Sequence, residues 1–391
     1  MFRKLFLLVT VGAMAFTSSA QAAEKIKIGV VTTLTTPASL IGKQLKFGME
    51  IAAEHLGYKM SGKDFELLFE DDALNPKQGK QKTEKLVKKD KVDFLTGYVW
   101  SHVLAASVPV GLKAGLIVIS ANAGHAKFSG KACNKNFFNI AWENSQTPMA
   151  MGHLLNKKGV KSLYVLSLNY AAGKQMVGGV ERTFKGKIVG KDLVPLSHKD
   201  WSAELSKVKA AKPDGVFIFY PGKWGPAFFT QYQQAGLSGT PLYNVFSIDG
   251  ANLPFFQKRK MTQLLGMFNT NYWAPDLDNP QNKRFVADFK KKYGTYPAHF
   301  AAQAYDVIML IDAGVKAAGG NYKDTDAVRA GMEKADFPSL RGKLVFGKNH
   351  FPIQNFYSRE VVKDANGDWV MSLRETVLKN HAPVNSHECK M

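Results

Sequence analysis

The alternation of short apolar strands with helices constrains the fold of this chain more than any other feature of its sequence. Between Lys25 and Ser120, runs typical of buried strands are each followed by a segment with helical periodicity. The same alternation restarts at Lys161 and continues to Ile248. Alternation with short connections predicts parallel sheets with helices on both faces, and two such runs predict two similar α/β lobes. The predicted strands are residues 25–31, 65–71, 92–98, 116–120, 161–168, 187–196, 215–220 and 241–248.

The chain after Trp273 has a different pattern. Two long helices are predicted at 279–294 and 298–320, with a third at 325–335, before strands that turn at Asn366-Gly367. Helices that follow both sheets must pack back onto one of them, so the chain crosses between the lobes more than once and forms a hinge. We expect lobe I to comprise residues 24–141 and 274–350, and lobe II residues 142–273 and 351–391.

Residues 1–23 have the pattern of a secretory signal peptide. Two basic residues precede an apolar segment at 5–16, and small residues follow it. The apolar segment is too short to span a bilayer as a helix, and no later run is long enough. We therefore expect an exported protein whose mature chain begins near Ala23 or Glu24.

The net charge of +20 raises the question of a nucleic-acid partner. In an exported protein such a charge more often gives a basic surface or steers anionic small molecules, and the lysines are spread along the chain. We expect no nucleic-acid partner.

The chain has only two cysteines, Cys133 and Cys389. In an oxidising compartment an even pair favours a disulfide. Such a bridge would tie the end of the chain to a loop in its first third.

Motifs typical of enzymes are missing from the sequence. It contains no G-x-S-x-G and no H-E-x-x-H, and its nine histidines show no metal-ligand spacing. Residues 124–132 resemble a phosphate loop, but Ala132 stands where Ser or Thr is needed. We expect no catalytic residue, no metal site and no cofactor, with an exported enzyme as an alternative.

The junctions between strands and helices carry a shared set of residue types. Ligands of open parallel sheets bind at the carboxyl ends of the strands. Aromatic rings with hydroxyls and amides suit a pocket for a small, partly apolar ligand. The residues at these junctions are Thr33, Thr35, Tyr98, Trp100, Ser101, Asn122, Asn169, Tyr170, Tyr220, Trp224 and Asp249.

The order and spacing of residues 26–57, 93–120, 169–174 and 298–319 resemble the periplasmic substrate-binding proteins of ABC importers, of the Leu/Ile/Val-binding type. The resemblance implies a type I periplasmic-binding-protein fold, with two Rossmann-like lobes that close on a ligand about a three-segment hinge. It also implies a monomer that delivers a small-molecule ligand to an ABC transporter membrane permease.

The resemblance also implies roles for particular residues. Ser101 and the segment Asn122, Ala123 and Gly124 would hold the ligand carboxylate, because a hydroxyl and N–H groups at a helix N-terminus form an anion site. Tyr170 would line the cleft. Asp249 would bind an α-amino group, unless the alignment shifts by two residues to Ser247.

Departures from the family pattern argue for a different ligand. Ile41 stands where amino-acid binders commonly have an aromatic residue, and residues 121–124 lack their threonine. The cysteine-containing loop and the C-terminus resemble a branch associated with aromatic acids, in which Trp142 and Asn144 would face the cleft. We therefore hypothesise a binder of a small, aromatic carboxylate, with branched-chain or other aliphatic amino-acid binding (or amide binding) and ligand sensing as alternatives. The candidate ligand-binding residues are Ser101, Tyr98, Trp100, Asn122, Ala123, Gly124, Trp142, Asn144, Tyr170, Tyr220, Asp249 and Thr35, with Tyr98, Trp100, Tyr170 and Tyr220 as candidates for stacking.

Overall fold

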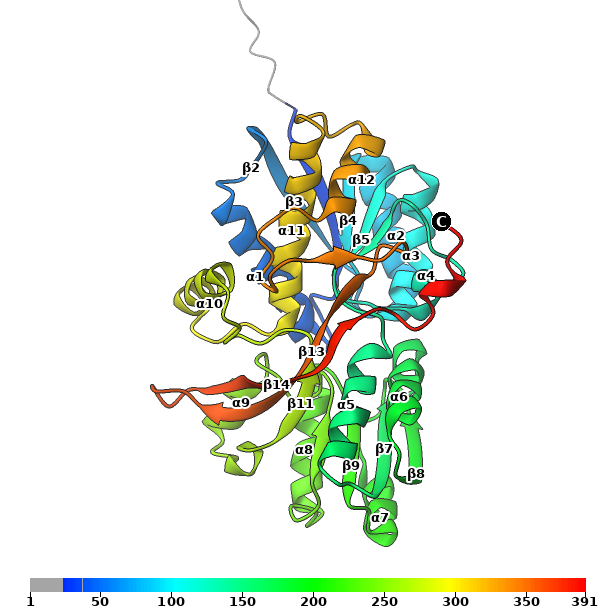
Figure 1. The fold of residues 1–391 in the computed structure, drawn as a ribbon, viewed down its shortest axis with the longest axis vertical. Helices are drawn as coiled ribbons and strands as arrows, with labels where there is room; N and C mark the ends of the chain where they lie inside the picture. The colour runs from blue at the N-terminus through cyan, green and yellow to red at the C-terminus, as the bar shows by residue number, and fades with distance from the viewer. Residues whose placement is uncertain (1–23, 37) are drawn as a thin grey trace, which may run out of the picture.

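The computed structural model describes residues 24–36 and 38–391, which form two α/β lobes joined at their middle (Figure 1). The predicted signal peptide lies outside the described residues. Within the described chain, no helix is both long and apolar enough to cross a membrane.

Lobe I is built on a six-stranded sheet in the order β2-β3-β1-β4-β5-β6. β1 runs parallel to β3 and β4, and only the short edge strand β2 is antiparallel to its neighbour. Ile26, Ile28 and Val30 of β1 are fully buried, because helices cover the sheet and apolar residues fill the strand. The strands are β1 (Ile26–Thr32), β2 (Lys59–Met60), β3 (Lys63–Asp71), β4 (Phe94–Gly97), β5 (Ile117–Ser120) and β6 (Phe137–Asn139).

Helices from both ends of the sequence cover this sheet. Figure 1 shows α11 lying beside α1, as expected for helices that pack back onto the first lobe. The two approach closely, since a Cβ atom at Gly48 would lie 2.0 Å from the carbonyl oxygen of Ala301. The helices are α1 (Ser39–His55), α2 (Pro76–Lys85) with a π-helical turn (Leu86–Asp90), α3 (Ser101–Lys113), α4 (Ala126–Ser129), α10 (Pro280–Tyr293), α11 (His299–Ala317) and α12 (Thr325–Lys334).

Lobe II is built on an eight-stranded sheet with the path β12-β13-β11-β10-β9-β7-β8, to which β14 adds through β13. β7 to β11 are parallel, whereas β13 is antiparallel to β11 and β14. The predicted turn at Asn366-Gly367 connects β13 to β14. The strands are β7 (Ser162–Leu168), β8 (Lys187–Val194), β9 (Gly215–Phe219), β10 (Leu242–Asn244), β11 (Phe268–Asn271), β12 (Val345–Phe346), β13 (Pro352–Lys363) and β14 (Trp369–His381), and the helices are α5 (Gln146–Lys157), α6 (Ala171–Thr183), α7 (Ser202–Ala211), α8 (Trp224–Gln234), α9 (Leu253–Lys258) and a 3₁₀ turn (Thr262–Leu264). A further 3₁₀ turn (Ser386–Glu388) lies in the segment after β14.

One predicted strand, 241–248, is shorter than expected. β10 ends at Asn244, whose side-chain oxygen accepts the N–H groups of Ser247 (3.3 Å) and Ile248 (2.9 Å). These bonds form a tight turn in which Phe246 takes a positive φ of 57°. Phe246 therefore belongs to the loop at the carboxyl end of the sheet.

Three connections between the lobes agree with the predicted hinge. Residues 140–145 and 272–279 make the first two, and β13 makes the third, starting against lobe I and pairing with β11 in lobe II. The exact lobe boundaries stay a prediction.

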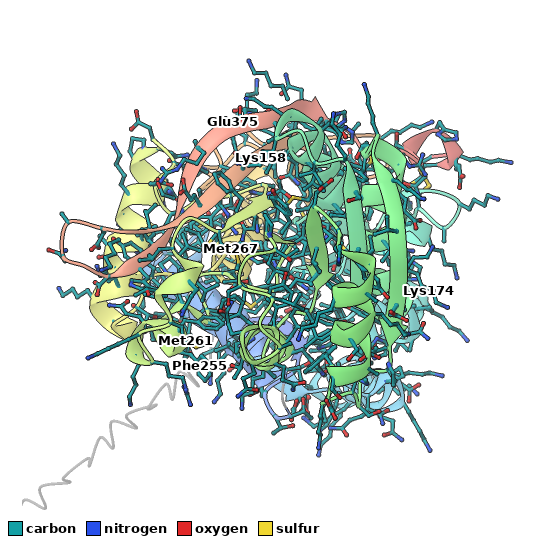
Figure 2. All side chains as sticks on the ribbon, turned by 90° about the horizontal axis from the view of Figure 1, so that it is seen from below. Lys158, Lys174, Phe255, Met261, Met267 and Glu375 are labelled. Atoms are coloured by element: carbon teal, nitrogen blue, oxygen red, sulfur yellow. A yellow bond between two sulfur atoms is a disulfide. The ribbon has the colours of Figure 1, made fainter. Side chains whose placement is uncertain are left out.

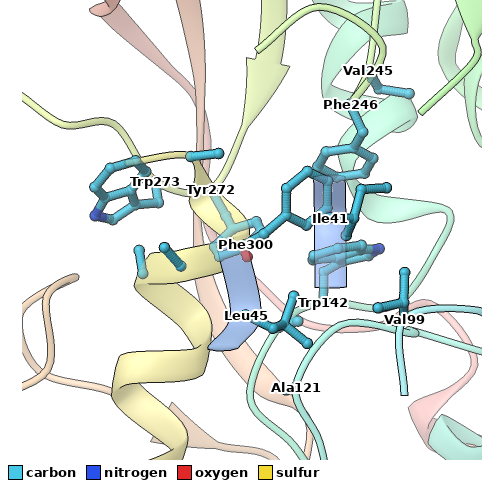
Figure 3. Close-up of a cluster of buried hydrophobic side chains, with 14 of the residues drawn as sticks. Ile41, Leu45, Val99, Ala121, Trp142, Val245, Phe246, Tyr272, Trp273 and Phe300 are labelled. Atoms are coloured by element: carbon cyan, nitrogen blue, oxygen red, sulfur yellow. The ribbon is translucent and has the colours of Figure 1, made fainter. Parts of the chain in front are cut away.

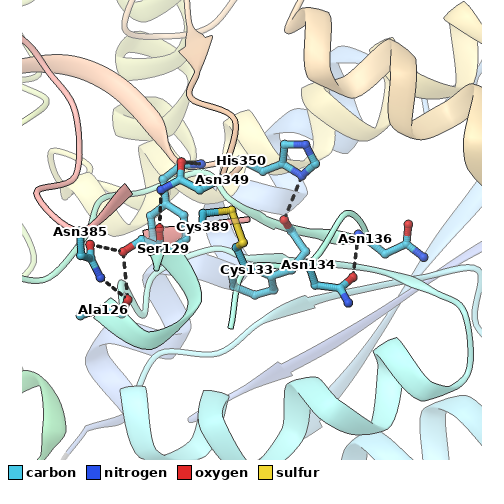
Figure 4. Close-up of a disulfide and its surroundings, with 11 residues drawn as sticks. Ala126, Ser129, Cys133, Asn134, Asn136, Asn349, His350, Asn385 and Cys389 are labelled. Atoms are coloured by element: carbon cyan, nitrogen blue, oxygen red, sulfur yellow. Dashed lines mark hydrogen bonds between the residues drawn. A yellow bond between two sulfur atoms is a disulfide. The ribbon is translucent and has the colours of Figure 1, made fainter. Parts of the chain in front are cut away.

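The segment after β14 returns to lobe I. Cys389 there forms the predicted disulfide with Cys133, with a Cα–Cα distance of 5.6 Å (Figure 4). Beside it, the Asn385 side chain accepts a 2.6 Å hydrogen bond from the Ser129 hydroxyl. The end of the chain, beyond 381, is thus fastened to lobe I and not to lobe II.

Basic side chains are spread around the end of lobe II. Figure 2 shows nitrogen-tipped side chains projecting in all directions around the end of lobe II. Several pair with nearby acids, such as Lys207 with Asp192 and Lys191 with Glu181.

Candidate ligand-binding site

A narrow cavity lies between the two lobes, at the carboxyl ends of the strands of both sheets. Six of its fifteen lining residues are aromatic, and they form what we call the aromatic wall: Trp100, Trp142, Tyr170, Phe219, Phe246 and Phe300. Figure 3 shows three of these rings, Trp142, Phe246 and Phe300, within a cluster of buried apolar side chains. The lining residues are Ile41, Val99, Trp100, Ser101, Asn122, Ala123, Trp142, Asn144, Tyr170, Ala172, Met176, Phe219, Pro221, Phe246 and Phe300.

A chain of polar side chains connects the lobes along one wall. The Asn144 amide donates to the Ser101 hydroxyl (3.0 Å) and to Gln175 of α6 (2.6 Å). Its oxygen accepts the backbone N–H of Gly124 (3.2 Å). The Ser101 hydroxyl accepts one bond, and its own hydrogen finds no acceptor in the described part of the chain. That hydrogen is free to donate to a ligand.

One helix from each lobe points its N-terminus at the cavity. α3 follows Trp100 and α6 follows Tyr170, and neither of these N-cap residues supplies a side-chain hydrogen bond to the helix. Both residues line the cavity. The first N–H groups of a helix lack partners within it, and the helix dipole makes this end positive. The two ends favour a negatively charged group between them.

The indole of Trp100 is held in a fixed orientation by buried polar groups. Its N–H donates to the Thr33 hydroxyl (3.0 Å), which in turn donates to Asp72 (2.6 Å). Burial raises the pKa of Asp72 to about 6. The ring then lies near Tyr170 (5.7 Å between centroids) and Trp224 (5.9 Å), both in lobe II.

Trp142 is one of the aromatic residues that line the cavity. It comes from the first connection between the lobes and stacks on Phe246 of lobe II, with 4.5 Å between ring centroids. Its ring nitrogen is buried without a partner among the described residues. Figure 3 shows this nitrogen on the side of the ring toward Val99. Trp142 therefore offers a second free donor to a ligand.

The structure brings together in this lining most of the residues predicted from the sequence. They are Trp100, Ser101, Asn122, Ala123, Trp142, Asn144 and Tyr170. The Asn122 side chain is already used, since it donates to Val99 (2.7 Å) and accepts from Gln303 (2.7 Å). The loop N–H groups expected to bind an anion are also used, because Ala123 donates to the carbonyl of Tyr98 and Gly124 to Asn144.

Tyr98 does not line the cavity. Gly97 and Tyr98 both have positive φ, of 103° and 63°, so the chain twists sharply where β4 ends. Tyr98 then packs into a separate apolar cluster on the other side of the sheet, with its hydroxyl 3.4 Å from Thr83. The same twist directs Trp100 into the cavity.

Four further candidates also lie outside the lining. Tyr220 packs against Trp201 and Phe228 within lobe II. Thr35 is exposed and donates to Asp71 (2.6 Å), and Gly124 lies behind Trp142, where a Cβ atom would be 2.1 Å from the Trp142 carbonyl oxygen. Asp249 is fully buried next to His299. The alternative to it, Ser247, accepts the backbone N–H of Tyr220 (2.7 Å) instead of facing the cavity.

Sequence reasoning missed part of the aromatic wall. Phe219 is the last residue of β9, Phe246 follows β10, and Phe300 lies in the first turn of α11. Phe219 and Phe246 sit at carboxyl ends of strands, a position that should have marked them. Phe300 carries no such signal, since it enters from a helix of the late segment.

The cavity lining contains no charged side chain. In the part of the chain that the structure describes, no group of three or more His, Cys, Asp or Glu residues could hold a metal ion. The site can therefore bind a ligand by aromatic contact, by a few hydrogen-bond donors and by the positive ends of two helices.

Comparisons with known proteins show which family and which solved structures the chain resembles. Residues 25–367 match the family described as periplasmic binding protein. The chain is 27% identical to Leu/Ile/Val-binding protein homolog 6 of Brucella abortus (strain 2308), over 97% of this chain and 98% of that protein.

Two solved structures are also similar. A solute-binding protein of an ABC transporter from R. palustris, in complex with benzoate, is 29% identical, with a TM-score of 0.87 and coverage of 94% of this chain and 100% of that one. A second, from Rhodopseudomonas palustris BisB5 in complex with 3,4-dihydroxybenzoic acid, is 25% identical, with a TM-score of 0.85 and coverage of 92% and 99%.

Proposed function

The chain belongs to the periplasmic binding protein family, and from this premise we propose that it captures a small aromatic carboxylate between its lobes for an ABC importer. Solute-binding proteins of this kind hand their ligand to a membrane permease.

The observation that carries the proposal is the pairing of an aromatic wall with uncharged hydrogen-bond donors in one small cavity. The Ser101 hydroxyl, the first N–H groups of α3 and the Trp142 ring nitrogen can all donate to a carboxylate. Trp142, Phe246 and Phe300 offer rings to a ligand ring. A benzoate-type acid suits both features, because its carboxylate can accept from the donors and its ring can pack against the aromatic side chains.

An α-amino acid fits this cavity less well. Its ammonium group needs an acceptor, preferably a carboxylate, yet the lining contains no acidic side chain. Asp249, predicted for this role, lies behind the wall. The similarity to a benzoate complex and a dihydroxybenzoate complex supports the aromatic ligand, whereas the similarity to a protein named for Leu, Ile and Val keeps the aliphatic amino acids as the second candidate.

Thermal unfolding with a panel of ligands tests the proposal. Benzoate-type acids should raise the unfolding temperature, because a ligand at a hundred times its Kd stabilises a protein by about 2.7 kcal/mol. Acetate controls for the carboxylate alone and should have no effect at the same concentration. Stabilisation by leucine or valine, with none by benzoate-type acids, would contradict the proposal.

Location and assembly belong to the same proposal. The family implies a periplasmic protein, and we infer that the segment 1–23 directs export and is removed near Ala23 or Glu24. We further infer a monomer that catalyses no reaction. Mass spectrometry of the exported protein checks the cleavage site, and unchanged ligand recovered after prolonged incubation checks the absence of turnover.

A further inference from the structure

A second group of polar side chains lies directly behind the aromatic wall. His299, at the first position of α11, packs on the rings of Phe246 (4.7 Å between centroids) and Phe300 (3.8 Å). Its Nδ1 is 3.7 Å from the Asp249 carboxylate. Arg359 of β13 is fully buried, close enough to Asp249 for their charges to interact, and it is held by Asn269 (3.0 Å) and by the carbonyl of Trp273. We refer to His299, Asp249 and Arg359 as the rear cluster.

Each member of the rear cluster has a polar atom without a partner among the described residues. These atoms are both ring nitrogens of His299, one carboxylate oxygen of Asp249 and one terminal nitrogen of Arg359. Buried polar groups in native proteins are almost always hydrogen-bonded. Three neighbouring exceptions, all at least 98% buried, indicate that a further group binds there.

The unpaired atoms define the chemistry of that group. Arg359 can only donate, the free oxygen of Asp249 accepts, and neutral His299 does one of each. Burial holds the pKa of His299 well below its usual value, so its ring is neutral. A hydroxyl both donates and accepts, whereas a carboxylate only accepts and an ammonium group only donates. A hydroxyl therefore matches the rear cluster best.

We propose that the rear cluster is a second subsite of the cavity, which binds a hydroxyl group on the ring of an aromatic carboxylate. This inference rests on the proposed function, which places the carboxylate near Ser101. Phe246 separates the rear cluster from the cavity, and it lies in a loop with a positive φ. For the ligand hydroxyl to reach His299, the Phe246 ring must turn aside on binding.

Calorimetric titration of the purified protein with benzoate and its three monohydroxy derivatives tests the proposal. The wild type should bind at least one hydroxybenzoate about tenfold more tightly than benzoate, as expected for added hydrogen bonds to buried groups. In His299→Phe the ratio of the hydroxybenzoate affinity to the benzoate affinity should fall to within about twofold. His198→Phe, a histidine in lobe II outside the cavity, is the matched control and should keep the preference.

Asp249→Asn provides a second variant in case His299→Phe fails to fold. Asn keeps the bond that the Asp249 side chain accepts from the Ala251 N–H (2.9 Å) but turns the free acceptor into a donor, so the hydroxyl preference should again disappear. If the wild type prefers no hydroxybenzoate, or if both folded variants keep the preference, the rear cluster holds only water and the proposal is wrong. If leucine binds and no benzoate does, the proposed function fails first and this subsite fails with it.

Discussion

Ser101 is the side chain on which carboxylate binding most directly depends. It begins α3, accepts from Asn144 and keeps its own hydrogen free toward the cavity. Its neighbour Trp100 is fixed by Thr33 and Asp72, so a donor and a ring are presented side by side.

Ser101→Ala should weaken the binding of benzoate-type acids by about tenfold or more, because a hydrogen bond to a charged group contributes about 1.5–3 kcal/mol. Calorimetric titration measures the change. Ser107→Ala, two turns further along α3 and outside the cavity lining, is the control and should bind as the wild type does. Equal affinities for both variants would remove Ser101 from the site.

Asp72 should make the protein less stable as the pH rises from about 4 to 6. Its pKa is raised by burial from an ordinary value of 3.8 to about 6, so in this interval the folded state holds a proton that the unfolded state has lost. Stability therefore falls across this window and is constant above it, with a total cost of about 3 kcal/mol.

In Asp72→Asn the free energy of unfolding should decrease less between pH 4 and 6 than in the wild type, as measured by urea unfolding at pH 4, 5, 6 and 7. Asp278→Asn, at an exposed position where a bond to Lys283 lowers the pKa, should leave the fall unchanged. Asp249 and Glu143 have pKa values raised by burial to about 6 and about 7, so part of the decline should persist. An identical pH profile in Asp72→Asn and the wild type would contradict the assignment.

At the scale of elements, the close packing of α6 against the end of β7 determines where Tyr170 and Ala172 lie in the cavity wall. A Cβ atom at Gly173, in the first turn of α6, would lie 1.7 Å from the carbonyl oxygen of Leu168. By contrast, a Cβ atom at Gly178, further along the same helix, would have no neighbour within 4 Å. The helix can therefore start where Tyr170 and Ala172 reach the cavity.

Gly173→Ala should destabilise the protein by about 1–3 kcal/mol, because the helix must move away from the strand. It should also weaken ligand binding, since Tyr170 moves with the helix. Gly178→Ala, on the same helix, should instead stabilise by about 0.5–1 kcal/mol. Denaturant unfolding and titration of both variants distinguish close packing from helix propensity, and similar effects of the two changes would refute the packing argument.

The alternation of strands and helices made the two lobes predictable, because each apolar run needs cover on both faces. The same pattern indicated that ligands bind at the strand ends, and it found Trp100, Ser101 and Tyr170. It could not separate Tyr98 from Trp100, because the direction of each side chain depends on the positive φ at Gly97 and Tyr98.

Other parts of the site depend on contacts between distant segments. Phe300 reaches the cleft from α11, and His299 lies behind the wall next to it, roughly 200 residues after Ser101, and no local pattern signals this meeting. Phe246 was assigned to a strand that the Asn244 side chain ends early. Asp249 was predicted to bind the ligand, whereas the structure places it outside the cavity lining, next to His299.

At the scale of the whole molecule, the Cys133–Cys389 disulfide joins points 256 residues apart in the sequence. Without reductant the protein should carry no free thiol, and labelling of two thiols in the native protein would contradict the bridge. The Cys133→Ser, Cys389→Ser variant should be less stable by about 2–5 kcal/mol, measured by denaturant unfolding, with the wild type under reducing conditions as a comparison. Equal stability would show that the bonds around Asn385 are enough to hold the tail.

The return of the tail to lobe I makes a covalent ring of residues 133–389, and the whole of lobe II lies within that ring. A protease that cuts one loop anywhere inside it leaves a single molecule, whose two fragments separate only after reduction. Lobe II thus cannot be lost through one nick, and a nicked protein can keep both walls of its cavity.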